Sequence, residues 1–228
     1  MTTANFKQDL FAQFARVGKA LSNGNRLELL EFLAQSERSV DTLAKLSGLS
    51  VANTSQHLQQ LRQSGLVLSR KEGLKVFYRL SSDDVIELLD TLRTVAEQHV
   101  AEIDQMVNSY LTVKDSLEPI SREELISRAS EDLVTVIDVR PAEEYASGHV
   151  PGAVNVPLSE LESHLLDFDP EQEIVAYCRG PHCVLAFDAV ARLREKGLKA
   201  RRLEDGYPEW KTAGLPVEKE TTQLHRLN

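Results

Sequence analysis

Apolar residues in the first part of the chain recur every three or four positions, which predicts a series of amphipathic helices. Four such stretches are expected, at residues 5–21, 25–35, 40–46 and 51–63. The last two are joined by Ser47-Gly48-Leu49-Ser50, in which Ser50 can cap the fourth helix. A helix, a glycine-containing turn and a second helix are typical of the helix-turn-helix motif.

The pattern then changes to two strand-like runs, at residues 66–69 and 75–80. Lys71-Glu72-Gly73 joins them, and Gly73 can supply the turn, so a β-hairpin wing is expected. Charge strengthens this picture. The whole chain has a formal net charge of −9, yet residues 51–79 hold five basic side chains and one acidic side chain. A local basic patch is compatible with phosphate contact. The residues after 115 hold 13 basic and 21 acidic side chains and should repel DNA.

The helix expected at residues 51–63 has two different sides. Val51, Thr54, Leu58 and Leu61 are expected to face inward, and amide side chains gather on the other side. Amides at helical spacing can read adenine edges in a major groove, although they also suit any solvated helix. The candidate DNA-binding residues on this helix and the wing are Asn53, Thr54, Ser55, Gln56, His57, Gln59, Gln60, Arg62, Arg70, Lys71, Lys75 and Arg79.

Residues 16–81 resemble the ArsR/SmtB family of winged-helix repressors. The matching segments include Asn25-Arg26-Leu27-Glu28-Leu29-Leu30, Ser55-Gln56-His57-Leu58-Gln59-Gln60-Leu61, Gly65-Leu66-Val67 and Phe77-Tyr78-Arg79-Leu80. The resemblance implies a homodimer that binds double-stranded operator DNA with two-fold symmetry. The family's metal sites do not carry over. Residues 39–46 contain no cysteine, and the C-terminal helix offers only His99 with Glu102, so no metal site is expected.

A long helix is expected at residues 84–110, after Ser82 and Asp83. Its apolar stripe follows a heptad-like spacing through Val85, Leu89, Leu92, Ala96, His99, Ile103, Met106 and Tyr110. Such a stripe can pack on the core of its own domain, but its length favours a partner helix. We therefore expect this helix and the first one to form the dimer interface, with His99 as a packing residue.

After a polar stretch at residues 112–119, strands alternate with helices. Strands are expected at 134–139, 154–156, 173–177 and 198–203, and helices at 122–129 and 184–196. This order predicts a small, mostly parallel α/β sheet. The fold class is therefore a two-domain α/β protein. Residues 1–115 form a mainly α-helical winged helix-turn-helix domain for DNA binding and dimerisation, and residues 116–228 form the α/β domain.

The two cysteines of the chain, Cys178 and Cys183, lie in the loop between the 173–177 strand and the following helix. A strand–loop–helix order points backbone N–H groups and a helix N-terminus into the loop, so the Cys178 thiol should have a lowered pKa. The N-terminus has no signal-peptide pattern, and no apolar run approaches the ~18 residues of a membrane span, so a cytoplasmic protein without membrane contact is expected. In that compartment, two cysteines favour sulfur or redox chemistry, or metal binding, over a structural disulfide.

Residues 117–219 resemble a rhodanese domain. The resemblance rests on Asp138-Val139-Arg140, on the segment from Glu144 to Asn155, and on Gly206-Tyr207-Pro208-Glu209-Trp210 with the residues up to Val217. It places Cys178 as the nucleophile that forms a persulfide from a sulfur donor such as thiosulfate, a persulfide or a polysulfide. Phosphatases and arsenate reductases of this fold use Cys-x5-Arg, and Val184 stands where their arginine would be. The candidate catalytic residues are Cys178, Cys183, Arg179, Gly180, His182, Asp138 and Arg140.

These residues receive different roles. Asp138 and Arg140 are expected to brace the loop, and Trp210 to pack in the core. Arg179 and His182 either attract an anionic donor or belong to a solvated loop. Cys183 either resolves an oxidised Cys178 into a disulfide or polysulfide link, or is a small buried residue at a helix start.

We therefore hypothesise a transcriptional regulator, a repressor, whose operator binding weakens when reactive sulfur or oxidation modifies Cys178, with no cofactor. One alternative is a sulfurtransferase that uses the winged helix for dimerisation. The other is a regulator whose rhodanese domain is a catalytically inert binding module.

Overall fold

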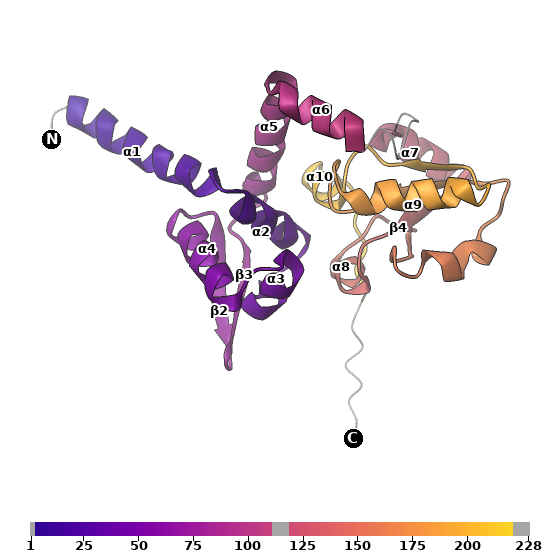
Figure 1. The fold of residues 1–228 in the computed structure, drawn as a ribbon, viewed down its shortest axis with the longest axis horizontal. Coiled ribbons are helices and arrows are strands. Elements are labelled where there is room, and N and C mark those ends of the chain that lie inside the picture. The colour runs from indigo at the N-terminus through magenta and orange to yellow at the C-terminus, as the bar shows by residue number, and fades with distance from the viewer. Residues whose placement is uncertain (1–2, 111–118, 221–228) are drawn as a thin grey trace. The chain divides into compact units, whose positions relative to one another are not determined.

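The computed structural model describes residues 3–110 and 119–220, and its helices and strands are labelled in Figure 1. The described chain divides into two compact units, Met1–Leu89 and Asp90–Asn228. The polar stretch expected between the domains lies, except for Pro119, outside the described residues. The domain limits at residues 115 and 116 stay a prediction.

The first unit contains the four expected helices and the expected hairpin. Its elements are α1 (Thr3–Leu21), α2 (Gly24–Gln35), β1 (Arg38–Ser39), α3 (Val40–Ser47), α4 (Val51–Gln63), β2 (Val67–Glu72) and β3 (Lys75–Leu80). The side chain of Asn23 caps α2, Ser39 caps α3 and Ser50 caps α4, each by accepting a backbone N–H. The predicted winged helix-turn-helix is confirmed in these elements.

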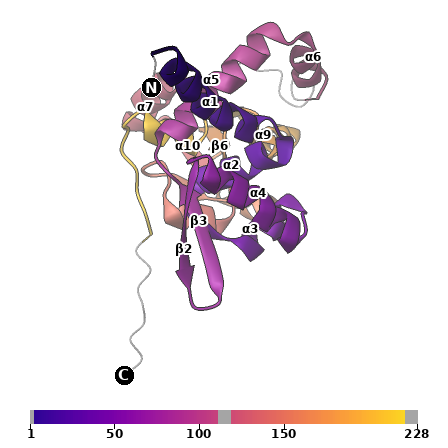
Figure 2. The same cartoon turned by 90° about the vertical axis from the view of Figure 1, so that its left-hand side faces the viewer.

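Two details of this unit differ from the prediction. The short strand β1 was not expected. It pairs antiparallel with β3, which gives the sheet order β1-β3-β2. The hairpin also extends further than predicted, because Glu72 pairs with Lys75 and the turn consists of Gly73 and Leu74. The hairpin tip extends past the helices of this unit (Figures 1 and 2).

The core of the first unit lies between α2, α3, α4 and the sheet. Leu29, Leu30, Leu43, Leu58 and Leu61 have no exposed surface. Burial of side chains of this size stabilises a domain by about 1.5–3 kcal/mol each. Val51 was expected to face this core, but it is 51% exposed in the first turn of α4, so that prediction was wrong.

The single helix predicted at residues 84–110 was also wrong. Two helices, α5 (Asp84–His99) and α6 (Ala101–Tyr110), occur there, separated by Val100. The spacing of apolar residues does not show whether a helix is continuous. A single non-helical residue between two amphipathic helices leaves the apolar spacing of both unchanged. Val85 and Ile86 are buried in the core of the first unit, whereas His99, Leu92 and Val95 are exposed on this chain.

The second unit contains the expected parallel sheet. After α5 and α6 it comprises α7 (Arg122–Ser130), β4 (Val134–Asp138), α8 (Ala142–Ser147), β5 (Val154–Asn155), the 3₁₀ helix η1 (Leu161–Asp167), β6 (Glu173–Tyr177), α9 (Val184–Glu195), β7 (Ala200–Arg202) and α10 (Tyr207–Thr212). The strand order is β5-β4-β6-β7, and each of these neighbouring pairs is parallel. The prediction of a mostly parallel α/β sheet is thereby confirmed.

Both faces of this sheet are buried, as is usual for parallel sheets. Ile137, Ala176 and Cys178 pack on the face that α9 covers, in one apolar cluster with Val190 and Leu193. The alternate strand residues pack in a second cluster that includes Trp210, which is 3% exposed, so its predicted packing role is confirmed. Among the described residues, no helix is long and apolar enough to cross a bilayer.

Candidate thiol site and nucleic-acid interface

The cysteine loop begins where β6 ends and finishes at the first turn of α9. Cys178 follows Tyr177 and is only 1% exposed, whereas Cys183 is half-buried at the N-cap of α9. Both are free thiols. The Cys178 thiol donates to the carbonyl oxygen of Cys183 across 3.4 Å, and the Cys183 N–H donates to the carbonyl oxygen of Gly180 across 3.1 Å. The loop is therefore tightly folded around the Cys178 sulfur.

The two thiols differ in acidity. Burial raises the pKa of Cys178 well above its ordinary value, even though the N–H groups of Gly180 and Ala186 favour the thiolate. The pKa of Cys183 is lowered, first by its hydrogen bond with Cys178 and then by the N–H groups of Arg179 and Leu185. The lowered pKa that the sequence predicted for Cys178 is therefore contradicted, because loop order does not reveal complete burial.

The start of α10 closes the loop from one side. The N–H of Tyr207 donates to the carbonyl oxygen of Cys178 across 3.0 Å. A Cβ at Gly206 would lie 2.3 Å from the Gly180 nitrogen, so backbone meets backbone and no side chain fits. The Glu209 carboxylate accepts the Gly206 N–H at 3.1 Å and a guanidinium hydrogen of Arg93 at 3.2 Å. Gly206 and Glu209 complete a site that the sequence predicted without them, although both lie in the quoted C-terminal signature.

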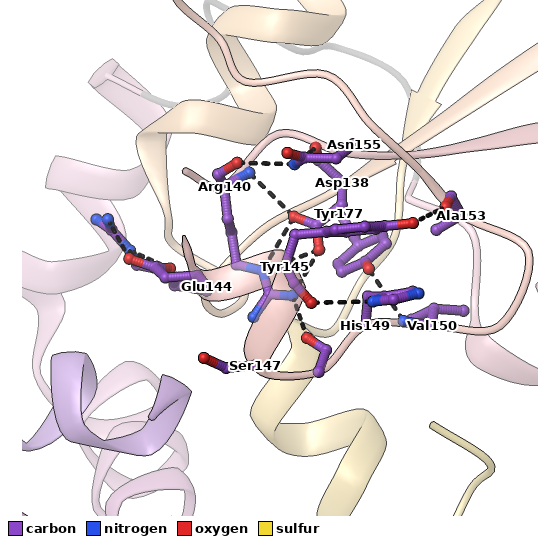
Figure 3. A network of polar contacts seen from close by, with 12 residues as sticks. Asp138, Arg140, Glu144, Tyr145, Ser147, His149, Val150, Ala153, Asn155 and Tyr177 are labelled. Atoms are coloured by element: carbon purple, nitrogen blue, oxygen red, sulfur yellow. Dashed lines mark hydrogen bonds and ion pairs between the residues drawn. The ribbon is translucent and has the colours of Figure 1, made fainter. Parts of the chain in front are cut away.

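Asp138 and Arg140 form an ion pair with no exposed surface, shown in Figure 3. The Arg140 Nε donates to Asp138 Oδ1 at 2.9 Å, and its Nη2 donates to the carbonyl oxygen of Gly148 at 2.8 Å. The guanidinium also lies over the Tyr207 ring, 4.4 Å from its centre. The ion pair thus fixes Gly148 in the turn after α8 and packs on Tyr207 of α10. Because Tyr207 bonds to Cys178, the pair supports the cysteine loop indirectly, by way of Tyr207.

The loop arginine and histidine both contact carboxylates. Arg179 donates from Nε and Nη2 to Glu144, at 2.8 Å for the shortest pair, and the Glu144 side chain is 1% exposed. His182 Nε2 lies 2.5 Å from Glu97 Oε1 of α5. Glu144 was not predicted as a site residue. Glu144 opens the segment quoted for the rhodanese resemblance, but nothing in the sequence indicates that its partner is Arg179.

The predicted DNA-binding face of α4 is mostly exposed. Asn53, Gln56 and Gln59 are exposed, and Ser55 and His57 are half-buried. Burial and the neighbouring charge of Arg26 lower the pKa of His57, which favours its neutral form. Two predicted residues have internal partners: the buried Thr54 hydroxyl donates to the Ser50 carbonyl oxygen at 3.0 Å, and Gln60 Oε1 accepts from Arg26 at 2.8 Å.

The basic residues around the wing have different environments. Arg70 pairs with Glu37 at 2.7 Å and with Glu72, and its guanidinium lies over the Phe77 ring. Arg62 donates to the Ser69 hydroxyl at 3.3 Å, and Arg79 donates to the Leu80 carbonyl oxygen at 3.2 Å. Lys71 and Lys75 are exposed on the two strands. The positive charge of Arg70 is thus largely compensated by Glu37 and Glu72, whereas Lys71, Lys75 and Arg79 are exposed cations of the wing.

Comparisons with known proteins agree with both halves. Residues 23–69 match the family model "Bacterial regulatory protein, arsR family", and residues 121–213 match the model "Rhodanese-like domain". The chain is 44% identical over 212 residues to the HTH-type transcriptional regulator Rv0324 of Mycobacterium tuberculosis. The match covers 93% of this chain and 93% of Rv0324.

The chain belongs to the ArsR family of bacterial regulatory proteins. It is a transcriptional regulator with an ArsR-type helix-turn-helix and a rhodanese-like domain. Among solved structures, the winged-helix domain Mb0332 of Mycobacterium bovis, described as homodimeric and DNA-binding, is 41% identical. That match covers 44% of this chain and 93% of that one, with a TM-score of 0.41. A rhodanese-related protein of Thermoplasma volcanium is 26% identical over 45% of this chain and 98% of that one, with a TM-score of 0.40.

In this ArsR regulator, only some of the predicted catalytic residues lie next to the Cys178 thiol. Cys178, Cys183 and Gly180 share hydrogen bonds in one loop. Arg179 and His182 belong to the same loop, but their side chains pair with Glu144 and Glu97 and not with the thiols. The Asp138–Arg140 pair contacts Tyr207, whose N–H donates to the Cys178 carbonyl oxygen. The chemistry available at this site is therefore that of two adjacent thiols in a cradle of backbone N–H groups.

Proposed function

We propose that this ArsR-family regulator binds operator DNA as a homodimer and loses affinity for it when reactive sulfur converts Cys178 to a persulfide. The observation that carries the proposal is the Cys178 thiol itself, which is 1% exposed beneath a tight strand-to-helix loop and donates to the Cys183 carbonyl oxygen. A modification inside so closed a loop changes its packing, because a buried site has no spare volume for an added atom.

The loop suits sulfane sulfur. When a thiolate attacks the outer sulfur of a persulfide donor, the donor's S–S bond breaks, its thiolate leaves and a new cysteine persulfide forms. The N–H groups of Gly180 and Ala186 point at the Cys178 sulfur and would stabilise the negative charge of the product. Small persulfides and polysulfides can donate in this way, and thiosulfate can donate its outer sulfur with sulfite as the leaving group.

The DNA-binding part of the proposal rests on α4 and the wing. Asn53, Gln56 and Gln59 present exposed amides on one helix, and Lys71 and Lys75 present exposed cations on the neighbouring strands. The amides suit base edges in a major groove, and the lysines suit the phosphates beside it.

The dimer part rests on apolar surface that this chain leaves exposed. Phe6, Phe11 and Phe14 on α1 are each more than half exposed, and Leu92 and Val95 on α5 are 40% and 52% exposed. Large apolar side chains gathered on helices in this way mark an interaction surface. The similar Mb0332 domain of Mycobacterium bovis is described as homodimeric.

The proposal is tested by DNA binding of the full-length protein with and without sulfur loading. The DNA is first selected by the protein itself from a random-sequence pool, and sodium tetrasulfide is the donor. The wild type should lose affinity on loading by about tenfold or more, in keeping with couplings of about 1–3 kcal/mol in regulators. Cys178→Ser should bind the same DNA and keep its affinity after treatment. An unchanged wild-type affinity would refute the proposed response.

A second candidate function is sulfur transfer itself, favoured by the match of residues 121–213 to the rhodanese-like domain. Steady-state turnover of thiosulfate with a thiol acceptor, lost in Cys178→Ser, would support it. If the protein turns over thiosulfate but selects no DNA from the random-sequence pool, the sulfurtransferase is the better description. If the wild type shows no turnover and Cys178→Ser leaves DNA binding and regulation unchanged, the rhodanese domain is an inert binding module.

A further inference from the structure

The two thiols of the loop are not equally accessible. Cys178 is 1% exposed, with its backbone carbonyl held by the Tyr207 N–H and its thiol directed at the Cys183 carbonyl oxygen. Cys183 is half-buried at the start of α9. Because Cys183 has exposed surface and Cys178 has almost none, a donor from solvent reaches Cys183 before it reaches Cys178.

The two sulfurs also differ in what surrounds them. Carbonyl oxygens of Gly180 and Cys183 accept from the Cys178 thiol, and this arrangement favours its protonated form. Each sulfur receives two backbone N–H groups, from Gly180 and Ala186 at Cys178 and from Arg179 and Leu185 at Cys183. The difference is that Cys178 is completely buried, whereas Cys183 is half-buried. The thiolate, which is the nucleophile, therefore forms more readily on Cys183.

We propose that Cys183 is the thiol that takes sulfane sulfur from a small persulfide or polysulfide and then passes it to the buried Cys178. This inference rests on the proposed function, and it specifies how the same site is loaded.

The relay balances without any added oxidant. The Cys183 thiolate attacks the outer sulfur of the donor R–S–SH, the donor's S–S bond breaks, and R–S⁻ leaves and takes a proton from water. The product is a persulfide on Cys183. The Cys178 sulfur then attacks the outer sulfur of that persulfide, the Cys183–sulfur bond breaks, and the Cys178 proton passes to the departing Cys183 sulfur. The transferred sulfur keeps its oxidation state throughout.

The sequence offers a direct way to follow this relay. Trypsin cleaves after Arg179, so the two cysteines separate into different peptides, with Cys183 in the peptide 180–192. Full-length protein is mixed with sodium tetrasulfide, quenched at increasing times with an alkylating agent that caps thiols and persulfides, digested, and weighed by mass spectrometry. In the wild type the extra sulfur should be found first in peptide 180–192 and later in the peptide that ends at Arg179.

Two variants decide the order of events. In Cys178→Ser, Cys183 should gain sulfur at the wild-type rate and retain it. In Cys183→Ser, loading of Cys178 should slow by about tenfold or more, because the accessible thiolate is gone. Serine replaces only the sulfur atom, and circular dichroism with the fluorescence of Trp210 checks that both variants fold. The wild-type loading rate should also rise with pH with a midpoint below that of a free thiol, since the pKa of Cys183 is lowered.

The relay is overturned if Cys178 gains sulfur equally fast in Cys183→Ser and in the wild type, or if sulfur reaches the peptide that ends at Arg179 first. These results do not depend on DNA. If the relay operates but loaded protein keeps its DNA affinity, the proposed regulation fails and the inference about Cys183 stands.

Discussion

The outer face of α4 and the cysteine loop are built in different ways. The candidate DNA contacts Asn53, Gln56 and Gln59 are exposed side chains of one helix. The loop around Cys178 is closed by residues from separate segments, with Glu144 of α8 bonded to Arg179 and Gly206 packed against Gly180. Changes on α4 should therefore alter binding without altering stability. Changes around the loop should alter stability and reactivity together, and four predictions test this difference.

The largest effect is expected for Arg140→Met. Both members of the Asp138–Arg140 pair are fully buried, so the substitution leaves a buried carboxylate without its partner, at a cost of about 3–5 kcal/mol in the free energy of unfolding. Denaturant unfolding followed by the single tryptophan, Trp210, measures the second unit specifically. The matched control is Arg192→Met, whose pair with Glu162 is 43% and 56% exposed and should cost about 0–1 kcal/mol. Equal losses in both variants would contradict the role given to burial.

Gly206→Ala should have the next largest effect. Its new Cβ would lie 2.3 Å and 2.4 Å from backbone atoms of Gly180, so the loop or α10 must move, at a cost of about 1–3 kcal/mol. The displaced loop should also expose Cys178, which faster alkylation of that residue would reveal. Gly180→Ala is the control, because its Cβ meets only side-chain atoms at 3.8 Å and 3.9 Å. If Gly206→Ala leaves both stability and alkylation unchanged, the loop is not held by this contact.

Gln56→Ala should weaken DNA binding and leave stability unchanged. A well-placed amide contact to adenine is worth about 1–3 kcal/mol, and the exposed Gln56 side chain contributes nothing to the core. Titration of the selected DNA and of single-base variants measures the loss, which should be confined to one or two base positions. Gln105→Ala, an exposed glutamine of α6, is the control. A uniform loss at every position would assign Gln56 to phosphate contact instead.

The smallest effect is expected for Lys71→Ala. A lysine on the wing that contacts phosphate contributes similarly to every sequence, so its removal should lower the salt dependence of binding by about one unit of slope. Arg70→Ala should change that slope less, because Glu37 and Glu72 already compensate its charge. A larger change for Arg70 would mean that its ion pairs break when DNA binds.

Much of the fold follows from local pattern. The apolar spacing locates α2, α3 and α4 to within a residue or two. Ser39 and Ser50 also indicate where α3 and α4 begin, because a cap and its helix are neighbours in sequence. The break at Val100 could not be predicted, since helical spacing continues on both sides of it. The two-residue strand β1 exists only through its pairing with Tyr78 and Phe77 of β3, a long-range contact that residues 38 and 39 do not reveal.

For the thiol site, the sequence alone determined that Cys178 and Cys183 stand between a buried strand and a helix, because strand, loop and helix are read from consecutive residues. Only the tertiary structure decided which thiol is buried, and with it the opposite pKa shifts of the two sulfurs. It also assigned Glu144 to Arg179 and Glu209 to Arg93. The physical reason is that desolvation and ion pairing depend on atoms brought together from distant segments, and no local pattern specifies those neighbours.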